Sequence, residues 1–430
     1  MKIQSHPQRD RAWQELHTRP FVRFTAPAHI LHLAFLGGEE TNAADDENRA
    51  RLIEAMSLVA TYESPKHSIH AVTLNELGRL VLCWERHSEY TAFTFFFYEL
   101  KKEFQPFGFD FEKVLPPGWL QSLGGVPLVA TQIAVGRRDE MPNTLDSLTT
   151  LFEGHTLNGS QIMAGLGEAW TCYRTHGDGL GRIAVVVNTM SAQEIGRTVQ
   201  RLVAIEDYYH LALLSAPLAS EIQPELVAAE DLMVEEMDKL YKAASVEEKR
   251  AVLDTLLSLA AEVEHLRART AKRFGGSIAY FSLLKARFDE LREAKIDHVL
   301  PLDRFVMRRL VPAIDTCRST HRRLISLSER INRAAELLRT SVELIVQEQN
   351  LRLLESANQK AHLQLRLQQS VEALSVVVIS YYALGLLGHL LDGVESTGVG
   401  LNVKLALGIA TPIVLAAVWI IVHRVRKQFR

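Results

Sequence analysis

The stretch ALSVVVISYYALGLLGHLL, residues Ala373–Leu391, determines how this 430-residue chain is organised. It contains 19 residues without Asp, Glu, Lys or Arg, and a second uncharged run of 18 residues, LALGIATPIVLAAVWIIV, covers Leu405–Val422. At about 1.5 Å per helical residue, each run is roughly 27–28 Å long, which is close to the ~30 Å hydrocarbon thickness of a bilayer. We therefore predict two transmembrane helices, 373–391 and 405–422, joined by a short external loop, 392–404.

Basic residues flank these runs unequally. The loop 392–404 holds one lysine and two acids, whereas the basic residues outside the runs are Arg352, Lys360 and Arg366 before them and Arg424, Arg426, Lys427 and Arg430 after them. The positive-inside rule then predicts that both termini, including a basic tail at 423–430, are cytoplasmic. Trp419, Arg424, Arg426 and Lys427 are the expected membrane anchors. The first ten residues lack an apolar core, so we expect no signal peptide and a multi-pass protein of the bacterial inner membrane.

The segment before the first span is typical of one long helix. No glycine or proline occurs in the 72 residues between Pro312 and Gly385, which would span roughly 108 Å as a helix. Leu324, Ile331, Leu338 and Ile345 repeat every seven residues, which favours a bundle or coiled coil. We predict a stalk helix at 303–372 that packs against helices of its own chain or of other copies, which makes a homo-oligomer the expected assembly.

The remaining residues divide into two parts. Residues 1–190 predict a mixed α/β domain, with a helix at Glu47–Tyr62. The apolar runs that predict strands are Ala28–Leu36, Leu80–Trp84, Ala92–Tyr98, Leu128–Val135, Ala169–Arg174 and Ile183–Val187. Residues 191–302 predict a helical bundle with three breaks. Ser215-Ala216-Pro217 and Gln223-Pro224 mark the first, Phe274–Gly276 the second and His298–Leu302 the third. The fold class is therefore α+β, followed by a helical stalk and two transmembrane helices.

Composition excludes several classes of protein. The chain is 47% hydrophobic and 23% charged, with a net charge of −3, so neither disorder nor a nucleic-acid partner is expected. Three distant cysteines exclude a disulfide scaffold. No zinc-protease, phosphate-loop, esterase or kinase motif occurs, so we expect no metal, no cofactor and no enzymatic activity.

The N-terminal histidines are not expected to form a metal site. His29 and His32 would face opposite sides of their strand, and His67 and His70 follow Pro65 in an expected loop.

Two dense polar clusters are the candidate binding residues. The first surrounds the segment Glu15-Leu16-His17-Thr18-Arg19-Pro20-Phe21, and the second is Trp84-Glu85-Arg86-His87. Such clusters form either an ion-pair network between domains or a ligand pocket. With the nearby His6, the candidate residues are His6, Glu15, His17, Arg19, Trp84, Glu85, Arg86 and His87.

Four segments of the chain point to a known family. They are His6-Pro7-x-Arg9, the 15–21 cluster, the 84–87 cluster, and Val371-Glu372-Ala373-Leu374-Ser375 running into Ser380-Tyr381-Tyr382. They resemble an uncharacterised, membrane-anchored bacterial family, a domain of unknown function. The resemblance covers nearly the whole chain and implies no activity.

The order of the predicted parts is also similar to that of CorA-type magnesium channels, in which a long helix and the first span line a pore. That family's Gly-Met-Asn motif is replaced here by Tyr382-Ala383-Leu384-Gly385-Leu386-Leu387-Gly388-His389. Three functions therefore compete: a membrane-anchored scaffold or sensor, a CorA-like channel or transporter for a metal cation, and, least favoured because no catalytic motif occurs, an enzyme tethered to the membrane. In the channel, Ser375, Ile379 and Tyr382 would line the pore from one helical face.

Overall fold

The computed structural model describes residues 6, 8–9, 21–37, 42–64, 66–74, 77–101, 103–122, 126–395 and 402–428. The chain forms two compact units. One consists of Met1–Asp238 and Thr255–Arg333, and the other of Lys239–Asp254 and Ala334–Arg430. The first holds a sheet and most of the shorter helices, and the second holds two long apolar helical segments, so the predicted α+β class is confirmed.

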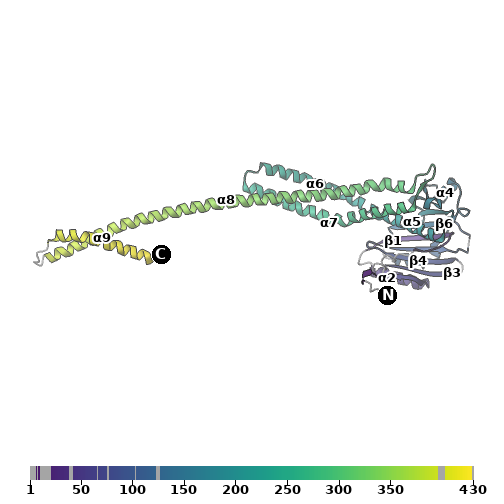
Figure 1. Cartoon of the computed structure of the whole chain (residues 1–430), viewed down its shortest axis with the longest axis horizontal. Helices are drawn as coiled ribbons and strands as arrows, with labels where there is room; N and C mark the ends of the chain where they lie inside the picture. Colours follow the sequence, from purple (N-terminus) through teal and green to yellow (C-terminus); the bar gives the residue numbers. More distant parts are fainter. Residues whose placement is uncertain are drawn as a thin grey trace. The chain divides into compact units, whose positions relative to one another are not determined.

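A ten-stranded sheet organises the first unit (Figure 1). Its order is β10-β7-β8-β9-β6-β1-β5-β4-β3-β2, and all neighbours are antiparallel except β6 and β9. The strands are β1 Ala28–Leu36, β2 Val59–Ser64, β3 His67–Leu74, β4 Gly78–Arg86, β5 Tyr90–Tyr98, β6 Val129–Arg137, β7 Asn158–Ile162, β8 Gly167–Thr175, β9 Gly181–Val187 and β10 Ala294–Lys295. A hairpin at 175–180 joins β8 to β9 and is closed by a hydrogen bond from His176 N to Leu180 O.

The helices lie between and after these strands in the sequence. They are α2 Asn42–Ala55, α3 Trp119–Ser122, α4 Leu145–Leu151, α5 Ala192–Leu213, α6 Ser215–Lys242, α7 Val246–Leu291, α8 Leu302–Glu395 and α9 Val403–Gln428, with short 3-10 turns at Phe111–Lys113 and Met163–Gly165. Ser191 and Glu194 form a reciprocal capping box at the start of α5. Ser245 and Glu248 exchange equivalent bonds before α7.

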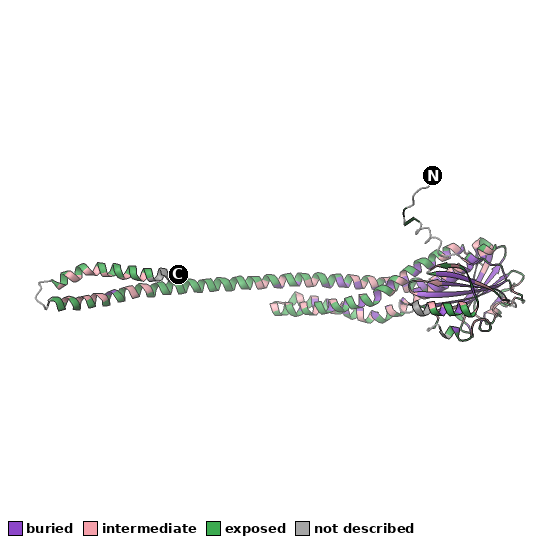
Figure 2. Cartoon of the chain, turned by 90° about the horizontal axis from the view of Figure 1, so that it is seen from below, coloured by how far each residue is buried: buried purple, intermediate pink, exposed green. Residues whose placement is uncertain are grey.

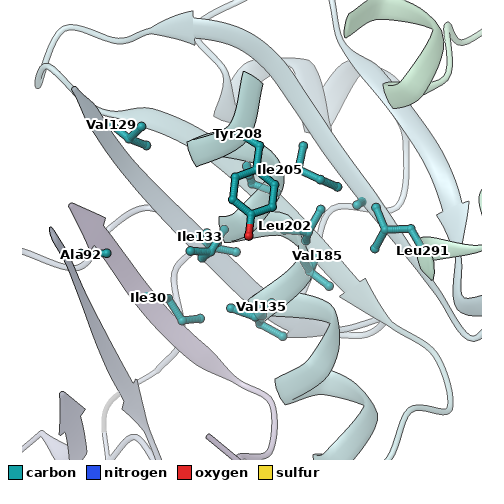
Figure 3. Packing of buried hydrophobic residues seen from close by; sticks show 14 of the residues in the cluster. Ile30, Ala92, Val129, Ile133, Val135, Val185, Leu202, Ile205, Tyr208 and Leu291 are labelled. Atoms are coloured by element: carbon teal, nitrogen blue, oxygen red, sulfur yellow. The ribbon is translucent and has the colours of Figure 1, made fainter. Parts of the chain in front are cut away.

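The centre of the sheet is covered on both faces, which explains its composition. All nine residues of β5, YTAFTFFFY, are buried. Phe93, Phe95 and Phe97 pack with Trp119 on one side, and Ala92 and its alternate neighbours join the apolar layer under α5 on the other. Figure 3 shows this second layer, where side chains of α5 such as Leu202 and Ile205 lie over those of the central strands.

Two predictions in the N-terminal part were wrong. The helix expected at Glu47–Tyr62 ends at Ala55, where Ser57 turns the chain with a φ of 54°, and β2 follows. The β-branched and aromatic residues Val59, Thr61 and Tyr62 favour this strand, but its edge position leaves them without a regular apolar alternation. His67 and His70 lie in β3 rather than in a loop.

One of the three predicted helix breaks was also wrong. Phe274-Gly275-Gly276 lies inside the 46-residue helix α7. The break marked by Ser215–Pro217 is present between α5 and α6, although Pro224 lies inside α6. Glycine weakens a helix by about 1 kcal/mol per residue. The burial of Phe274 and Ser277 on either side outweighs that cost. Gly276 also provides room for the Glu89 carboxylate, which lies 3.4 Å from where a Cβ would stand.

The predicted long helix is present and is longer than expected, because α8 contains 94 residues. Leu324, Ile331 and Leu338 of its seven-residue stripe are buried, as is the stripe of α7, which is Val252, Leu256, Leu259, Val263 and Leu266. Every residue of α8 from 347 to 371 is exposed, and Figure 2 shows this segment in green.

Candidate ligand-binding site

The alternation of β4 divides the predicted cluster 84–87 between the two faces of the sheet. Trp84 and Arg86 lie on the α2 side, where the Arg86 guanidinium is 4.9 Å from the Trp84 ring and 2.8 Å from Asp46 Oδ1. Arg49 of α2 covers the same ring at 4.3 Å. Glu85 and His87 lie on the opposite face, toward α5. The first pair therefore stabilises the α2 contact, and the second pair lines a cavity.

This cavity has a volume of about 580 Å³ and lies between the sheet, α5 and α7. That volume suits a small molecule. Its walls are Phe21, Glu85, His87 and Tyr90 on one side, Arg197, Gln200, Arg201, Val203, Ala204, Asp207 and Tyr208 from α5, and Arg287 and Glu290 from α7. Phe21 is the last residue of the first predicted polar cluster, 15–21. The structure therefore brings members of both clusters to one cavity.

Gly196 allows the segment at Phe21 to reach α5. A Cβ at Gly196 would stand 2.0 Å from Val22 O and 3.1 Å from the Phe21 ring. Only glycine permits this approach. Arg197 then covers the Phe21 ring at 5.0 Å, which holds its guanidinium at the cavity wall.

Three guanidiniums and three carboxylates line the cavity, and Glu290 is the most exposed of these carboxylates. Glu290 Oε2 lies 3.0 Å from Arg201 Nε and 2.7 Å from a terminal nitrogen of Arg287. Burial alone would raise the pKa of Glu290, but the hydrogen bond from Arg201 and the charge of Arg287 outweigh it and lower that pKa. The three arginines of the wall are matched in number by Glu85, Asp207 and Glu290, of which Glu85 lies beside His67 and Asp207 beside His32.

A buried polar chain lies behind the cavity wall. Asp207 Oδ1 accepts a bond of 2.9 Å from His32 Nε2, and the other ring nitrogen of His32 lies 2.9 Å from the Thr94 hydroxyl. All three side chains are buried. These bonds fix the orientation of the His32 ring and connect β1 and β5 to α5.

A second chain reaches the cavity from the neighbouring strands. His67 Nδ1 lies 3.2 Å from Glu85 Oε1, and its Nε2 lies 3.8 Å from the Cys83 sulfur. His67 and Glu85 are direct cross-strand partners of β3 and β4, and Cys83 is two residues from Glu85 on the same face. Burial raises the pKa of the Cys83 thiol well above its usual value, so it stays protonated.

The other predicted site residues lie elsewhere. His6 is exposed and accepts a bond from Gln8 N, and Glu15, His17 and Arg19 lie outside the described residues. Ser375 Oγ donates to Val371 O at 2.8 Å, and Ile379 and Tyr382 are exposed. Trp419 is exposed and stacks on His423, Arg424 is exposed, and the side chains of Arg426 and Lys427 lie outside the described ones.

Sequence reasoning missed the helical side of the cavity. One sign was available: Val203, Asp207 and Leu211 are spaced by four, which places an acid in the buried stripe of α5. A charged residue at such a position requires a partner, which here is His32. The pattern does not say which strand supplies that partner.

Two helices have the length and composition of membrane spans. The most apolar 18-residue window of α8 has a mean hydropathy of 1.9 and is 6% buried, and that of α9 has 2.5 and is 0% buried. Both windows therefore expose apolar surface that the described residues leave largely uncovered.

Comparison with known families and proteins gives one result. The family model described as "Protein of unknown function (DUF3422)" matches residues 4–429. No curated protein matches the chain. The comparisons lend no support to a similarity with CorA-type channels. The chain therefore belongs to the DUF3422 family, whose description assigns no activity.

Proposed function

We propose that this member of the family is a membrane-anchored sensor or scaffold, whose sheet domain binds a ligand and whose two C-terminal helices hold it in the bacterial inner membrane. The observation that carries the proposal is the hydropathy of α8 and α9 in windows that are 6% and 0% buried. A soluble protein buries its most apolar helices, whereas helices of this kind are stable when hydrocarbon covers them.

The proposed orientation has both termini in the cytoplasm. Basic residues lie before the first apolar window and after the second, and the connection between them holds only Lys404. Such a distribution supports an external loop of a few residues and a cytoplasmic sheet domain. That domain would then sense a cytoplasmic molecule.

The ligand that fits the cavity best is a small anion. Arg197, Arg201 and Arg287 line it, and the planar donors of arginine match carboxylate and phosphate groups. An incoming anion would replace Glu290 as the partner of Arg201 and Arg287. We propose binding rather than catalysis, because His32 and Asp207 are buried and hydrogen-bonded to each other.

We further propose that the stalk of α8 associates with other copies of the chain. Leu337, Leu344 and Leu351 repeat every seven residues and are 73%, 61% and 62% exposed. This second stripe is separate from the buried one at Leu324 and Ile331. Apolar residues at heptad spacing on an uncovered helix support a helical homo-oligomer.

Two measurements on the full-length protein test the anchor. Alkaline carbonate should leave the protein in the membrane pellet, and detergent should release it. A reporter enzyme active only in the cytoplasm should work when fused after Arg430, and one active only in the periplasm should work when inserted at 396–400. Release by carbonate, or periplasmic activity of the C-terminal fusion, contradicts the proposal.

Ligand binding is tested by thermal melting of the detergent-purified protein with inorganic phosphate, dicarboxylates and nucleotides. A stabilising anion should lose its effect in Arg201→Gln. The control Arg269→Gln removes an arginine that pairs with Glu221 and Glu225 outside the cavity, and it should respond as the wild type does. Ion flux in liposomes that contain the purified protein, raised further by Tyr382→Ala, would instead favour the channel.

A further inference from the structure

Three side chains with metal-binding atoms meet beside the β8–β9 hairpin, outside the cavity described above. They are Glu153 and His155, which follow α4, and His176, which follows β8. One ligand atom of each lies within 4.8 Å of those of the other two. Two imidazoles and a carboxylate are a donor set that divalent transition metals prefer.

His176 is the member that points to a ligand. Its side chain is completely buried, and its Nδ1 has no hydrogen-bond partner. Glu153 Oε2 lies 3.2 Å from this nitrogen, but not in the geometry of a hydrogen bond. A buried imidazole nitrogen without a partner is costly. A metal ion between Nδ1 and the carboxylate would satisfy both atoms.

The other nitrogen of His176 has a contact that suits this role. Nε2 lies 3.3 Å from the Cys172 sulfur. When Nδ1 binds a metal, Nε2 carries the proton and donates it toward that sulfur, which fixes the ring orientation. Burial raises the pKa of Cys172, so its sulfur remains a thiol and serves as a weak acceptor.

The charges around the cluster favour a cation. Arg182 lies 3.3 Å from Glu153 Oε1 and 3.1 Å from Asp178 Oδ2, so one guanidinium faces two carboxylates. With neutral histidines, the group carries a net negative charge. Arg182 takes the Glu153 oxygen that faces away from His176, and Oε2 stays directed at the imidazole.

The backbone places Glu153 where glycine is usual. The N–H of Gly154 bonds to Thr149 O and that of Glu153 to Thr150 O, so α4 ends in a Schellman motif. Glu153 occupies its left-handed position, with a φ of 56°. That conformation costs a non-glycine residue roughly 1–2 kcal/mol. The Glu153 side chain is therefore placed at this position at a local conformational cost.

We propose that Glu153, His155 and His176 bind a divalent transition-metal ion of the zinc class. The ligands are His176 Nδ1, one ring nitrogen of His155 and Glu153 Oε2. This set leaves a fourth position of a tetrahedral site for water or a further ligand. Cys172 holds His176 from behind.

A second cluster of similar composition, His67, Cys83 and Glu85, does not carry the same inference. His67 Nδ1 is already bonded to Glu85, and the Cys83 thiol is buried and protonated. Its donors satisfy one another, whereas His176 Nδ1 has no such partner. The metal is therefore assigned to the hairpin cluster.

The test uses the full-length protein in detergent, stripped with EDTA and titrated with Zn²⁺ by calorimetry. We expect about one Zn²⁺ per chain and a rise in Tm on binding. Glu153→Gln and His155→Gln alter the half-exposed members and should leave the fold intact. Each should weaken Zn²⁺ binding at least about 100-fold, because even an outer hydrogen-bonding partner is worth about 10–100-fold. Cys172→Ala should weaken it about tenfold.

Two controls distinguish this site from others. His265→Ala removes an exposed histidine of α7, and His67→Gln alters the second cluster. Both should bind Zn²⁺ as the wild type does. Co²⁺ should give the visible absorption of a four-coordinate site in the wild type and lose it in His155→Gln. Binding that survives both Glu153→Gln and His155→Gln, or that is lost in either control, overturns the proposal.

Discussion

His32 Nε2 lies 2.9 Å from Asp207 Oδ1, although 175 residues separate the two positions in the chain. The pair is buried within the apolar layer between β1 and α5, and Thr94 completes it from β5. A buried polar pair of this kind specifies which helix face meets which strand, because a shift of either element would leave both groups without partners.

Replacing Asp207 with alanine should therefore destabilise the protein strongly. Removing one member of a buried pair leaves the other unsatisfied, at an expected cost of about 3–5 kcal/mol. The measurement is the unfolding midpoint of the full-length protein in denaturant. Asp231→Ala removes an exposed acid of α6, and it should change the free energy of unfolding by less than about 0.5 kcal/mol. Equal effects of the two substitutions would show that the His32 contact contributes little.

Two glycines in helices of the first unit should respond to alanine in opposite directions. A Cβ at Gly196 would stand 2.0 Å from Val22 O, so Gly196→Ala must displace the segment that carries Phe21 and should cost about 1–3 kcal/mol. Gly275 of α7 has nothing within 4 Å of the same atom. Gly275→Ala should instead stabilise the protein by about 0.5–1 kcal/mol through helix propensity.

Melting temperatures of the two variants check this pair directly. Gly196→Ala should also weaken any anion that binds in the cavity, because Phe21 and Arg197 form part of its wall. A stabilising effect of Gly196→Ala would mean that the 21–22 segment does not rest on α5.

Elements that are buried on both sides were predicted correctly from the sequence, and exposed or locally unusual elements were not. Ala28–Leu36 was predicted with its observed bounds, because both faces of β1 are covered and all its residues except His29 and His32 are apolar. Residues 59–62 were mistaken for helix because β2 is an edge strand with mostly exposed residues. The glycines of α7 were mistaken for a break because local propensity does not include the packing of Phe274.

The candidate site was predicted only in part, for a related reason. Glu85 and His87 were predicted as candidate binding residues because they belong to a dense polar cluster in the sequence, and both line the cavity. Arg201 and Arg287 come from helices whose surface is rich in charge, where a functional arginine looks like any other. Which sheet face a helix covers depends on long-range packing, and a periodic pattern does not contain that information.

Stability should fall as pH rises because of Glu293. Burial raises the pKa of this carboxyl to about 7, and its Oε1 has no hydrogen-bond partner. Ser160 donates to the other oxygen at 2.7 Å. The folded state therefore holds a proton that the unfolded state releases near pH 4.5. The stabilisation is complete below pH 4.5 and is lost as pH rises through 7.

Glu293→Gln should remove most of this loss, because glutamine keeps an acceptor for Ser160 without a charge. At pH 8 it should be more stable than the wild type, by at most about 3 kcal/mol. The check is Tm between pH 5 and pH 8.5, with Glu262→Gln, an exposed acid of α7, as the control. Parallel wild-type and Glu293→Gln profiles would refute the assignment.

The buried and exposed apolar stripes of the α8 stalk should have separate functions. Ile331 is completely buried within its own chain, so Ile331→Asp should lower Tm by placing a charge in an apolar contact. Leu344 and Leu351 are exposed, so substituting both with lysine should leave the chain folded and disrupt only contacts between copies. Light scattering of the detergent-purified protein should then report a change from oligomer to monomer. Gln349→Lys places the same charge on the opposite side of the helix and should preserve the oligomer, since successive residues of an α-helix are rotated by about 100°. A wild-type monomer, or an oligomer unaffected by both lysines, would remove the stalk from the assembly and leave the bilayer as the partner proposed for the C-terminal part.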